Sequence, residues 1–204
     1  MHDVIIPARN ESPETLLPTI WAFRQQPDVN NIILSDDGLT LETLDALYRY
    51  PSREFSHQHT CAPCRGKGQA VKHALNYVTA DRVVFCDGDL HNFTVGHAQL
   101  LTHPSWTNQM VLGVTEPLPD HPPRPVPDHI HTLVTGERSV PVSLVRGLDL
   151  HGYCMEVQVN AAAERAKLPI EIVKLHGCRG TSRWTPARVT EMERDGAWLR
   201  EHGA

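Results

Sequence analysis

Short apolar runs alternate with amphipathic segments along the first half of the chain. Residues 4–6, 31–34 and 83–86 are apolar runs with the length and composition of buried strands. Apolar side chains then recur at helical spacing over 16–23 and 41–48. Strands that alternate with helices in this way predict a parallel sheet with right-handed crossovers, and therefore an α/β fold.

Local signals place the first boundaries. Pro7 has no backbone N–H to donate, so we expect the ladder of the first strand to stop there. Ser12 followed by Pro13 and Glu14 is typical of a helix that begins with a capping hydroxyl and proline in its first turn. The first helix is therefore predicted to begin at Pro13.

The same patterns predict the remaining elements. In chain order we expect a loop over 56–68, a helix over 69–78, a helical segment from 90 to 103, a strand over 109–114 and a helix over 144–148. A segment over 152–157 then runs into a long helix through 166, followed by a late strand over 170–175, a loop from 176 and an exposed helix over 186–204. Polarity alternates along 170–175, which is typical of an edge strand. We expect one domain over 1–204.

Composition limits the class of protein. The 204 residues are 40% hydrophobic, enough for one sizeable core. No window approaches the ~20 apolar residues of a membrane span, so we expect a cytoplasmic protein without a transmembrane segment. Five scattered cysteines favour reduced thiols. The formal charge of -5 gives no overall attraction to nucleic acid.

Acidic residues follow three of the predicted strands. Asp87 and Asp89 come directly after a buried strand, and Gly88 between them allows close backbone approach. Paired carboxylates at such a place favour a divalent cation with an anionic substrate, although Asp is also a good helix cap. Ligands bind beyond the carboxyl ends of parallel strands. The polar residues that this rule brings to one crevice are Arg9, Asn10, Glu11, Asp36, Asp37, Asp87 and Asp89.

The loop over 56–68 contains two candidate sites. Gly66, Lys67 and Gly68 precede a helix, where backbone donors and one ammonium could cradle a diphosphate. The segment lacks the pattern of a Walker loop, and a flexible helix start with a solvated lysine is the alternative. Upstream, a local zinc site is the other hypothesis, with His57, His59, Cys61 and Cys64 as ligands.

Residues 116–128 are dense in proline and cannot enter a helix or a sheet interior. We expect an exposed lid or a shortened insertion. A ligand for a proline-recognition domain is the rival interpretation.

The second half adds a carboxylate and a basic cluster. Glu156 lies near a predicted helix N-terminus, where it could complement the helix dipole, or bind or deprotonate an acceptor hydroxyl. His176, Arg179 and Arg183 follow the late strand, and one imidazole with two guanidinium groups suits a metal and a diphosphate.

Taken together, six motifs in fixed order resemble the GT-A fold glycosyltransferases of family 2 and their relatives. They are V-I-I-P-A-R-N-E, S-D-D-G, G-K-G-Q-A, D-G-D-L, T-G-E-R and G-Y-C-M-E, and they span about four fifths of the chain. The last two look most like the glucosyl-3-phosphoglycerate synthase and polyprenyl-phosphate sugar transferase branches. The resemblance implies a Rossmann-like, mixed but mainly parallel sheet flanked by helices, with a nucleotide-sugar half over 1–115 and an acceptor half over 129–185.

The resemblance also implies roles. The nucleoside would be held by Pro7, Arg9, Glu11 and Asp37, and the diphosphate by Lys67 with Arg179 and Arg183 near it. Mn²⁺ or Mg²⁺ would be bound by Asp89, with Asp87 and His176 as further ligands. Gly136, Glu137 and Glu156 would face the sugar and the acceptor, with Glu156 and Asp89 as the catalytic pair. The chain is much shorter than most relatives, so the resemblance does not indicate which acceptor it uses.

The expected reaction is transfer of a sugar from a nucleotide-diphosphate sugar to a hydroxyl, with the metal stabilising the leaving group. Asp37 could accept the imide proton of uracil, which favours a UDP-sugar. A small phosphorylated metabolite leads as acceptor, ahead of a lipid phosphate. A hydroxymethylated DNA base is a third acceptor, with Arg179, Arg183 and Arg188 on phosphates.

Two other functions compete with the glycosyltransferase, and a homodimer is conceivable for each. A nucleotidyltransferase would carry a glycine-rich loop where this chain has P-A-R-N-E. A non-catalytic sugar-nucleotide-binding module would tolerate loss of the acids, all of which are present.

Overall fold

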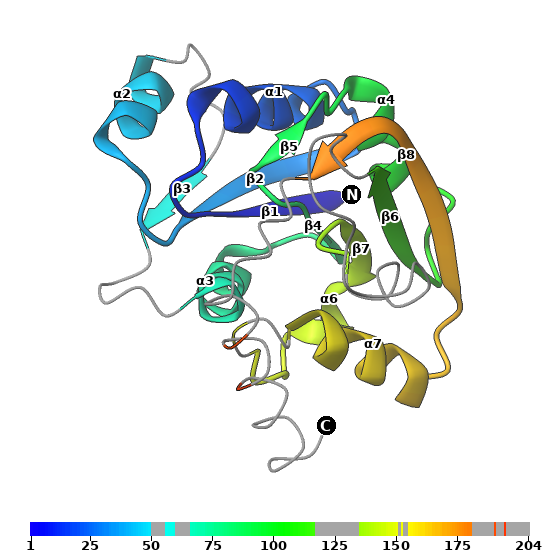
Figure 1. Cartoon of the computed structure of the whole chain (residues 1–204). Coiled ribbons are helices and arrows are strands. Elements are labelled where there is room, and N and C mark those ends of the chain that lie inside the picture. Colours follow the sequence, from blue (N-terminus) through cyan, green and yellow to red (C-terminus); the bar gives the residue numbers. More distant parts are fainter. Residues whose placement is uncertain are drawn as a thin grey trace.

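A computed structural model describes residues 1–49, 56–59, 66–116, 135–150, 152, 155–180, 190 and 194 (Figure 1). Its centre is a mixed sheet of eight strands in the order β3-β2-β1-β4-β7-β6-β8-β5. The strands are β1 (His2–Ala8), β2 (Val29–Asp36), β3 (Ser56–His59), β4 (Arg82–Phe85), β5 (Leu90–His91), β6 (Met110–Glu116), β7 (Arg138–Pro141) and β8 (Ile170–Gly180). Pairing is parallel from β3 to β4 and between β6 and β8, whereas β7 and β5 run antiparallel to their neighbours. The mainly parallel α/β prediction is confirmed.

Helices cover both faces of the sheet. They are α1 (Pro13–Arg24), α2 (Leu41–Arg49), α3 (Lys67–Ala74) with the 3₁₀ turn η1 (Leu75–Tyr77), α4 (Val95–Thr102), α6 (Val142–Val145) and α7 (Met155–Arg165). Figure 1 shows α1, α2 and α4 on one side of the sheet and α3, α6 and α7 on the other. This arrangement explains why β1 is buried along its whole length, as an apolar run between two helical layers should be.

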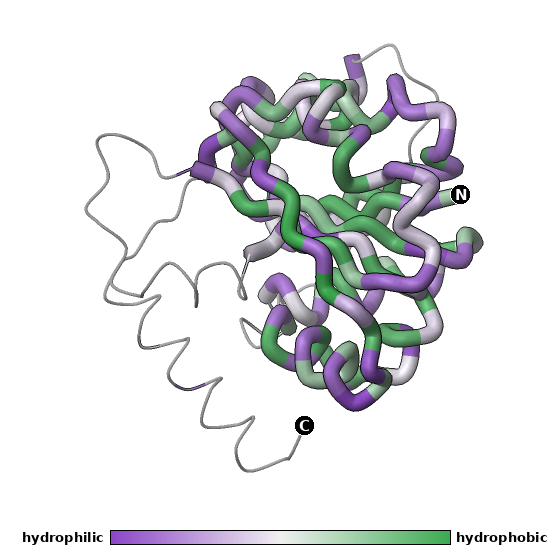
Figure 2. Tube along the Cα trace, turned by 90° about the vertical axis from the view of Figure 1, so that its right-hand side faces the viewer, coloured by the Kyte–Doolittle hydropathy of each residue, from purple (hydrophilic) through white to green (hydrophobic). Residues whose placement is uncertain are grey.

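Two separate apolar clusters fill these layers. Leu16, Ile20 and Phe23 project from α1 onto one face of the sheet and belong to the first cluster. Val71 of α3 and Val159 of α7 belong to the second cluster, on the opposite face. Figure 2 shows the apolar stretches following the strands through the middle of the molecule. The core therefore fixes the strands, and the strand ends are left to position polar groups.

The ladder of β1 does not stop at Pro7, as the sequence predicted. Pro7 pairs with Ser35 of β2, and the strand continues to Ala8. Ile5 O accepts a hydrogen bond from Cys86 N, and the pairing of β1 with β4 ends at Ile5. Residues two apart in a parallel strand bond toward the same neighbour. The N–H that Pro7 lacks would therefore point to the side where β4 has already ended, so the proline costs no ladder bond.

Two predicted loops contain strands instead. The first part of the expected loop 56–68 is β3, which pairs in parallel with β2. His176 and Arg179 belong to β8, which passes a register shift, with Gly177 at φ 77°, and then pairs with β5. Among the described strands, β6 alone pairs with residues 170–175 of β8, so the prediction of an edge strand is confirmed for these residues. Both loop predictions were wrong because the strands that pair with these segments are distant in sequence.

The helical segment expected directly after Asp89 begins later. Residues 90 and 91 form β5, and α4 starts at Val95. Thr94 caps it by accepting from His97 N, and the His97 ring completes a capping box. The N-terminus of α1 lies where it was predicted, since Ser12 is the N-cap residue and Pro13 opens the helix, but the Ser12 side chain makes no capping hydrogen bond to the described backbone.

Several sequence predictions fall outside the described residues. These are the proline-rich segment from 117 on, Cys61 and Cys64 of the zinc hypothesis, Arg183, Arg188, and most of the C-terminal helix, of which Thr190 and Arg194 are helical. Within the part of the chain that is described, no helix has the length and apolar character needed to cross a bilayer.

Candidate active site at the carboxyl ends of the parallel strands

The acids that follow β2 have different roles. Asp36 Oδ1 accepts hydrogen bonds from Gly38 N and Leu39 N at 2.9 and 2.8 Å, so this carboxylate closes the turn after the strand. Asp37 is also buried, and its backbone N donates to Ala8 O at the end of β1. The sequence grouped the two acids together, but Asp36 is structural, which leaves Asp37 as the candidate binding group.

Glu11, Asp87 and Asp89 come together beyond β1 and β4. Burial, followed by the negative charges of Asp89 and Asp87, raises the pKa of Glu11 to about 7. Glu11 Oε2 is buried and has no hydrogen-bond partner among the described residues. Gly88 makes the approach feasible, because a Cβ there would lie 3.3 Å from Glu11 Cγ. Three carboxylates therefore share one region, at a cost that a cation would offset.

Lys67 connects the two halves of the molecule. Its Nζ lies 2.6 Å from Asp87 Oδ1 and 2.7 Å from Glu156 Oε1, with 17% of its side chain exposed. Burial alone would lower the pKa of Lys67, but Asp87 and Glu156 outweigh it and raise that pKa above its usual range. The residue starts α3, after Gly66 at φ 88°. Its ammonium is thus held between an acid that follows β4 and an acid in the first turn of α7.

Glu137 belongs to a small proton-bearing network. Thr135 Oγ1 lies 2.6 Å from both Gly113 O and Glu137 Oε2. The hydroxyl has one hydrogen and cannot donate to both. A protonated Glu137 satisfies the geometry by donating to Thr135, which then donates to Gly113 O. Burial, followed by the charge of Asp87, raises the pKa of Glu137 to about 7, in agreement with a neutral acid.

We expect Glu137→Gln to change how stability depends on pH. The raised pKa of Glu137 adds stability that is complete below pH 4.5 and is lost as pH rises through about 7. A glutamine amide can donate to Thr135 at any pH. The free energy of unfolding of the variant, relative to the unmodified protein, should therefore rise by about 3 kcal/mol between pH 5 and pH 8.

Urea denaturation at several pH values measures this difference. Glu11 titrates alike in both proteins and cancels. A pH-independent difference would mean that Glu137 is already ionised in the folded protein.

Gly136 is required by Asp87. A Cβ at position 136 would lie 2.6 Å from Asp87 Cγ, well inside van der Waals contact. The glycine thus lets β7 approach the carboxylate that holds Lys67. Sequence resemblance placed Gly136 beside the sugar, and the structure adds this steric reason for the residue.

Arg138 received no role from sequence beyond its place in T-G-E-R. Its side chain is fully buried, and it donates from Nη1 to Glu156 O at 3.1 Å and to Asn160 Oδ1 at 3.0 Å, and from Nη2 to Thr135 O. The charges of Glu156, Glu137 and Asp87 act on it. In the sheet Arg138 pairs with Phe85 of β4 and with Leu112 of β6, so its buried guanidinium must find carboxylates or carbonyls. No sequence signal marked this environment, because residues 137 and 139 are polar.

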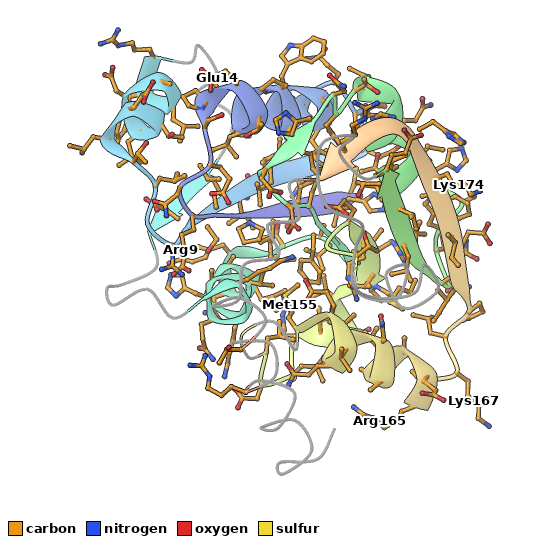
Figure 3. All side chains as sticks on the ribbon, in the orientation of Figure 1. Arg9, Glu14, Met155, Arg165, Lys167 and Lys174 are labelled. Carbon is orange, nitrogen blue, oxygen red and sulfur yellow. The ribbon has the colours of Figure 1, made fainter. Side chains whose placement is uncertain are left out.

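The structure places the other predicted residues less centrally. Figure 3 shows Arg9 where β1 ends and Met155 where α7, which carries Glu156, begins. The side chain of His176 is 79% exposed, and its Nδ1 lies 3.7 Å from Glu116 Oε1. Arg179 pairs with His91 of β5 through the backbone. Neither His176 nor Arg179 has a described bond to Asp87 or Asp89.

The donor set suits a hard cation. Among the described residues no three His, Cys, Asp or Glu side chains are arranged to hold a metal by themselves. Magnesium-type sites need only one or two carboxylates, because water and substrate phosphates supply the other ligands. Asp89 beside Glu11, with its buried and unpartnered Oε2, fits that pattern. Asp87 also lies here, but its Oδ1 is paired with Lys67.

Comparison with known proteins bears on the family match and on the fold. Residues 3–92 match the sequence model described as Glycosyl transferase family 2. Glucosyl-3-phosphoglycerate synthase from Mycobacterium tuberculosis, solved with Mn²⁺ and UDP-glucose, aligns with a TM-score of 0.77 at 22% identity over 98% of this chain and 78% of that chain. Its complex with Mn²⁺, UDP-glucose and phosphoglyceric acid aligns with a TM-score of 0.75 at 23% identity, over 95% of this chain and 76% of that chain. A further mycobacterial protein aligns with a TM-score of 0.75 at 21% identity, over 95% of this chain and 71% of that chain. No curated protein matches the chain significantly.

The fold and the family match agree on the same part of the chain. The matched residues contain β1, β2 and β4 with Glu11, Asp37, Lys67, Asp87 and Asp89. Residues 3–92 thus match the model of glycosyl transferase family 2, and the chain as a whole has the GT-A fold.

Proposed function

We propose that the protein is a metal-dependent glycosyltransferase that moves a sugar from a nucleotide-diphosphate sugar, with UDP favoured, to the hydroxyl of a small phosphorylated acceptor. The observation that carries the proposal is the convergence of Glu11, Asp87 and Asp89 beyond β1 and β4, next to Lys67. Acids and one ammonium at that place suit a cation and a diphosphate.

The nucleotide-sugar half, over 1–115, would bind the donor. Pro7, Arg9 and Asp37 lie at the ends of β1 and β2, where a nucleoside would be held. Asp37 would accept the imide proton of uracil. Lys67 starts α3, so a diphosphate would meet both its ammonium and the free backbone N–H groups of the first turn. Glu11 would complete the donor site beside Asp89.

Asp89 would hold Mn²⁺ or Mg²⁺, with Asp87 and His176 as further ligands. The ion would supply Lewis-acid stabilisation of the departing diphosphate. The structurally similar glucosyl-3-phosphoglycerate synthase was solved with Mn²⁺ and UDP-glucose, which supports this assignment.

The acceptor half, over 129–185, would present Gly136, Glu137 and Glu156. Glu156 is our candidate for the group that binds or deprotonates the acceptor hydroxyl. Its carboxylate is paired with Lys67, so a donor diphosphate that attracts Lys67 would release it for that role. Arg179 would assist at the diphosphate. A complex of glucosyl-3-phosphoglycerate synthase contains phosphoglyceric acid, which supports a phosphorylated metabolite as acceptor.

Metal-dependent binding of UDP tests the donor site. We expect calorimetric titration with UDP in Mn²⁺ to show binding that chelation abolishes and that exceeds the affinity for GDP. Asp89→Ala should weaken binding at least about 100-fold, since it removes a metal ligand. Asp45→Ala is the control, because Asp45 is an exposed acid of α2 that pairs only locally with Arg49.

If Asp89→Ala binds UDP as tightly as the unmodified protein, or if Mn²⁺ has no effect, the proposed donor site is wrong. The acids at the strand ends would then serve as capping groups of an ordinary α/β domain.

A further inference from the structure

We propose that Arg138 is a positioning residue, which holds the first turn of α7 against β7 and thereby sets the carboxylate of Glu156 in place. The inference rests on the proposed function for its meaning in catalysis. It stands on the contacts of one fully buried guanidinium.

The guanidinium connects two segments that are distant in sequence. Nη1 donates to Glu156 O and to Asn160 Oδ1, and these two residues are one helical turn apart on α7. Nη2 donates to Thr135 O, at the approach to β7. The planar fork of arginine makes these bonds at once from fixed directions, which a lysine ammonium on a flexible stem cannot reproduce. The backbone of Glu156 is therefore held at the residue whose carboxylate meets Lys67.

Neutralising charge does not account for the full set of bonds. Two positive groups, Lys67 and Arg138, lie among Asp87, Glu156 and Glu137. With Glu137 protonated, as its geometry with Thr135 requires, two positive charges face two negative ones. A balanced cluster needs a cation at position 138 but not three directed bonds to a helix turn and a strand approach. Those bonds are what a positioning role requires.

Other contacts hold the same junction at its periphery. Gln69 Nε2 donates to Leu150 O at 3.1 Å and Gln158 Nε2 donates to Asp149 O at 2.8 Å, so α3 and α7 both contact the segment between α6 and α7. Neither bond touches Glu156. Arg138 is the group among the described residues that bonds to Glu156 itself from β7.

The test compares Arg138→Met with Arg138→Lys and Asn160→Ala. The matched control is Arg146→Met, because Arg146 also donates to a backbone carbonyl, Val78 O at 2.9 Å, but is exposed and away from the cluster. The first readout is turnover of UDP-glucose with Mn²⁺ and 3-phosphoglycerate. We expect Arg138→Met to lower kcat about 100-fold with donor KM within about threefold, as displacement of a catalytic group does.

Arg138→Lys should recover thermal stability but not kcat. The kcat of Asn160→Ala should lie between that of Arg138→Met and that of the unmodified protein. If Arg138→Lys restores both, the residue only neutralises charge and the proposal is wrong. The double variant with Glu156→Gln decides whether the effect passes through Glu156. In that background the residual turnover should fall less than about threefold on adding Arg138→Met. If adding Arg138→Met still lowers kcat about 100-fold in the Glu156→Gln background, the proposal is wrong.

Hydrogen exchange of the ligand-free protein separates this inference from the proposed function. Arg138→Met and Asn160→Ala should accelerate amide exchange in residues 155–160 at least about tenfold, with β1 unchanged. If the unmodified protein shows no turnover, the proposed function fails and exchange alone decides the positioning role. Equal protection of residues 155–160 in all variants would exclude it.

Discussion

Lys67→Met should lower the free energy of unfolding by about 3 to 5 kcal/mol and weaken UDP binding in Mn²⁺ about 100-fold. The ammonium is the shared partner of Asp87 and Glu156, and the side chain of Glu156 is only 7% exposed. Methionine is similar in length to the apolar stem of lysine, and it leaves these carboxylates without the ammonium that they share. Urea denaturation and calorimetry measure the two losses.

Lys72→Met is the matched control for this prediction. Lys72 lies on the same helix and also pairs with an acid, Asp149, but its side chain is 46% exposed and that of Asp149 is 66% exposed. An exposed pair of this kind contributes about 0 to 1 kcal/mol. Adding Glu156→Gln to Lys67→Met should recover part of the stability, because one unpaired charge is removed. Equal losses for Lys67→Met and Lys72→Met would show that the central pair is unimportant.

Gly136→Ala should reduce turnover about 100-fold while costing only about 1 to 3 kcal/mol of stability. The new methyl group would lie 2.6 Å from Asp87 Cγ, so the carboxylate must move and its bond to Lys67 must lengthen or break. The core on either side of the sheet need not change. Activity with UDP-glucose and thermal unfolding, measured on the same preparation, separate the two effects.

Gly147→Ala provides the comparison, because a Cβ there meets nothing within 4 Å. It should leave turnover unchanged and alter stability by less than about 1 kcal/mol. Full activity in Gly136→Ala would mean that the position of Asp87 does not matter for the reaction.

The strands and helices of the first half follow from local patterns. Apolar runs such as 31–34 and 83–86 are buried strands, and Ser12 with Pro13 marks the start of α1 as predicted. The errors occur where pairing is long-range. The 56–59 segment is polar and lacks a strand pattern, yet it adds to β2. The end of β8 continues as a strand because Arg179 pairs with both Glu116 of β6 and His91 of β5.

The candidate site was predictable as a list of residues and not as a set of contacts. Parallel strand ends must meet, so Glu11 and Asp87 could be grouped from sequence. That Lys67 would reach Glu156, 89 residues away, depends on how α3 and α7 pack on the same face of the sheet. Arg138 was overlooked for the same reason, since its acceptors are carbonyls and an amide that no sequence pattern marks.

The strand order also bears on how the chain acquires its structure during synthesis. β7 lies between β4 and β6, although it is made after both. Until the ribosome has released residues 138–141, the free side of β4 and the facing side of β6 expose unpaired backbone groups, which can pair with another chain. We therefore expect a fragment that ends near residue 92 to aggregate, although it contains Glu11, Asp87 and Asp89. The nascent chain gains protection only when the central strand arrives.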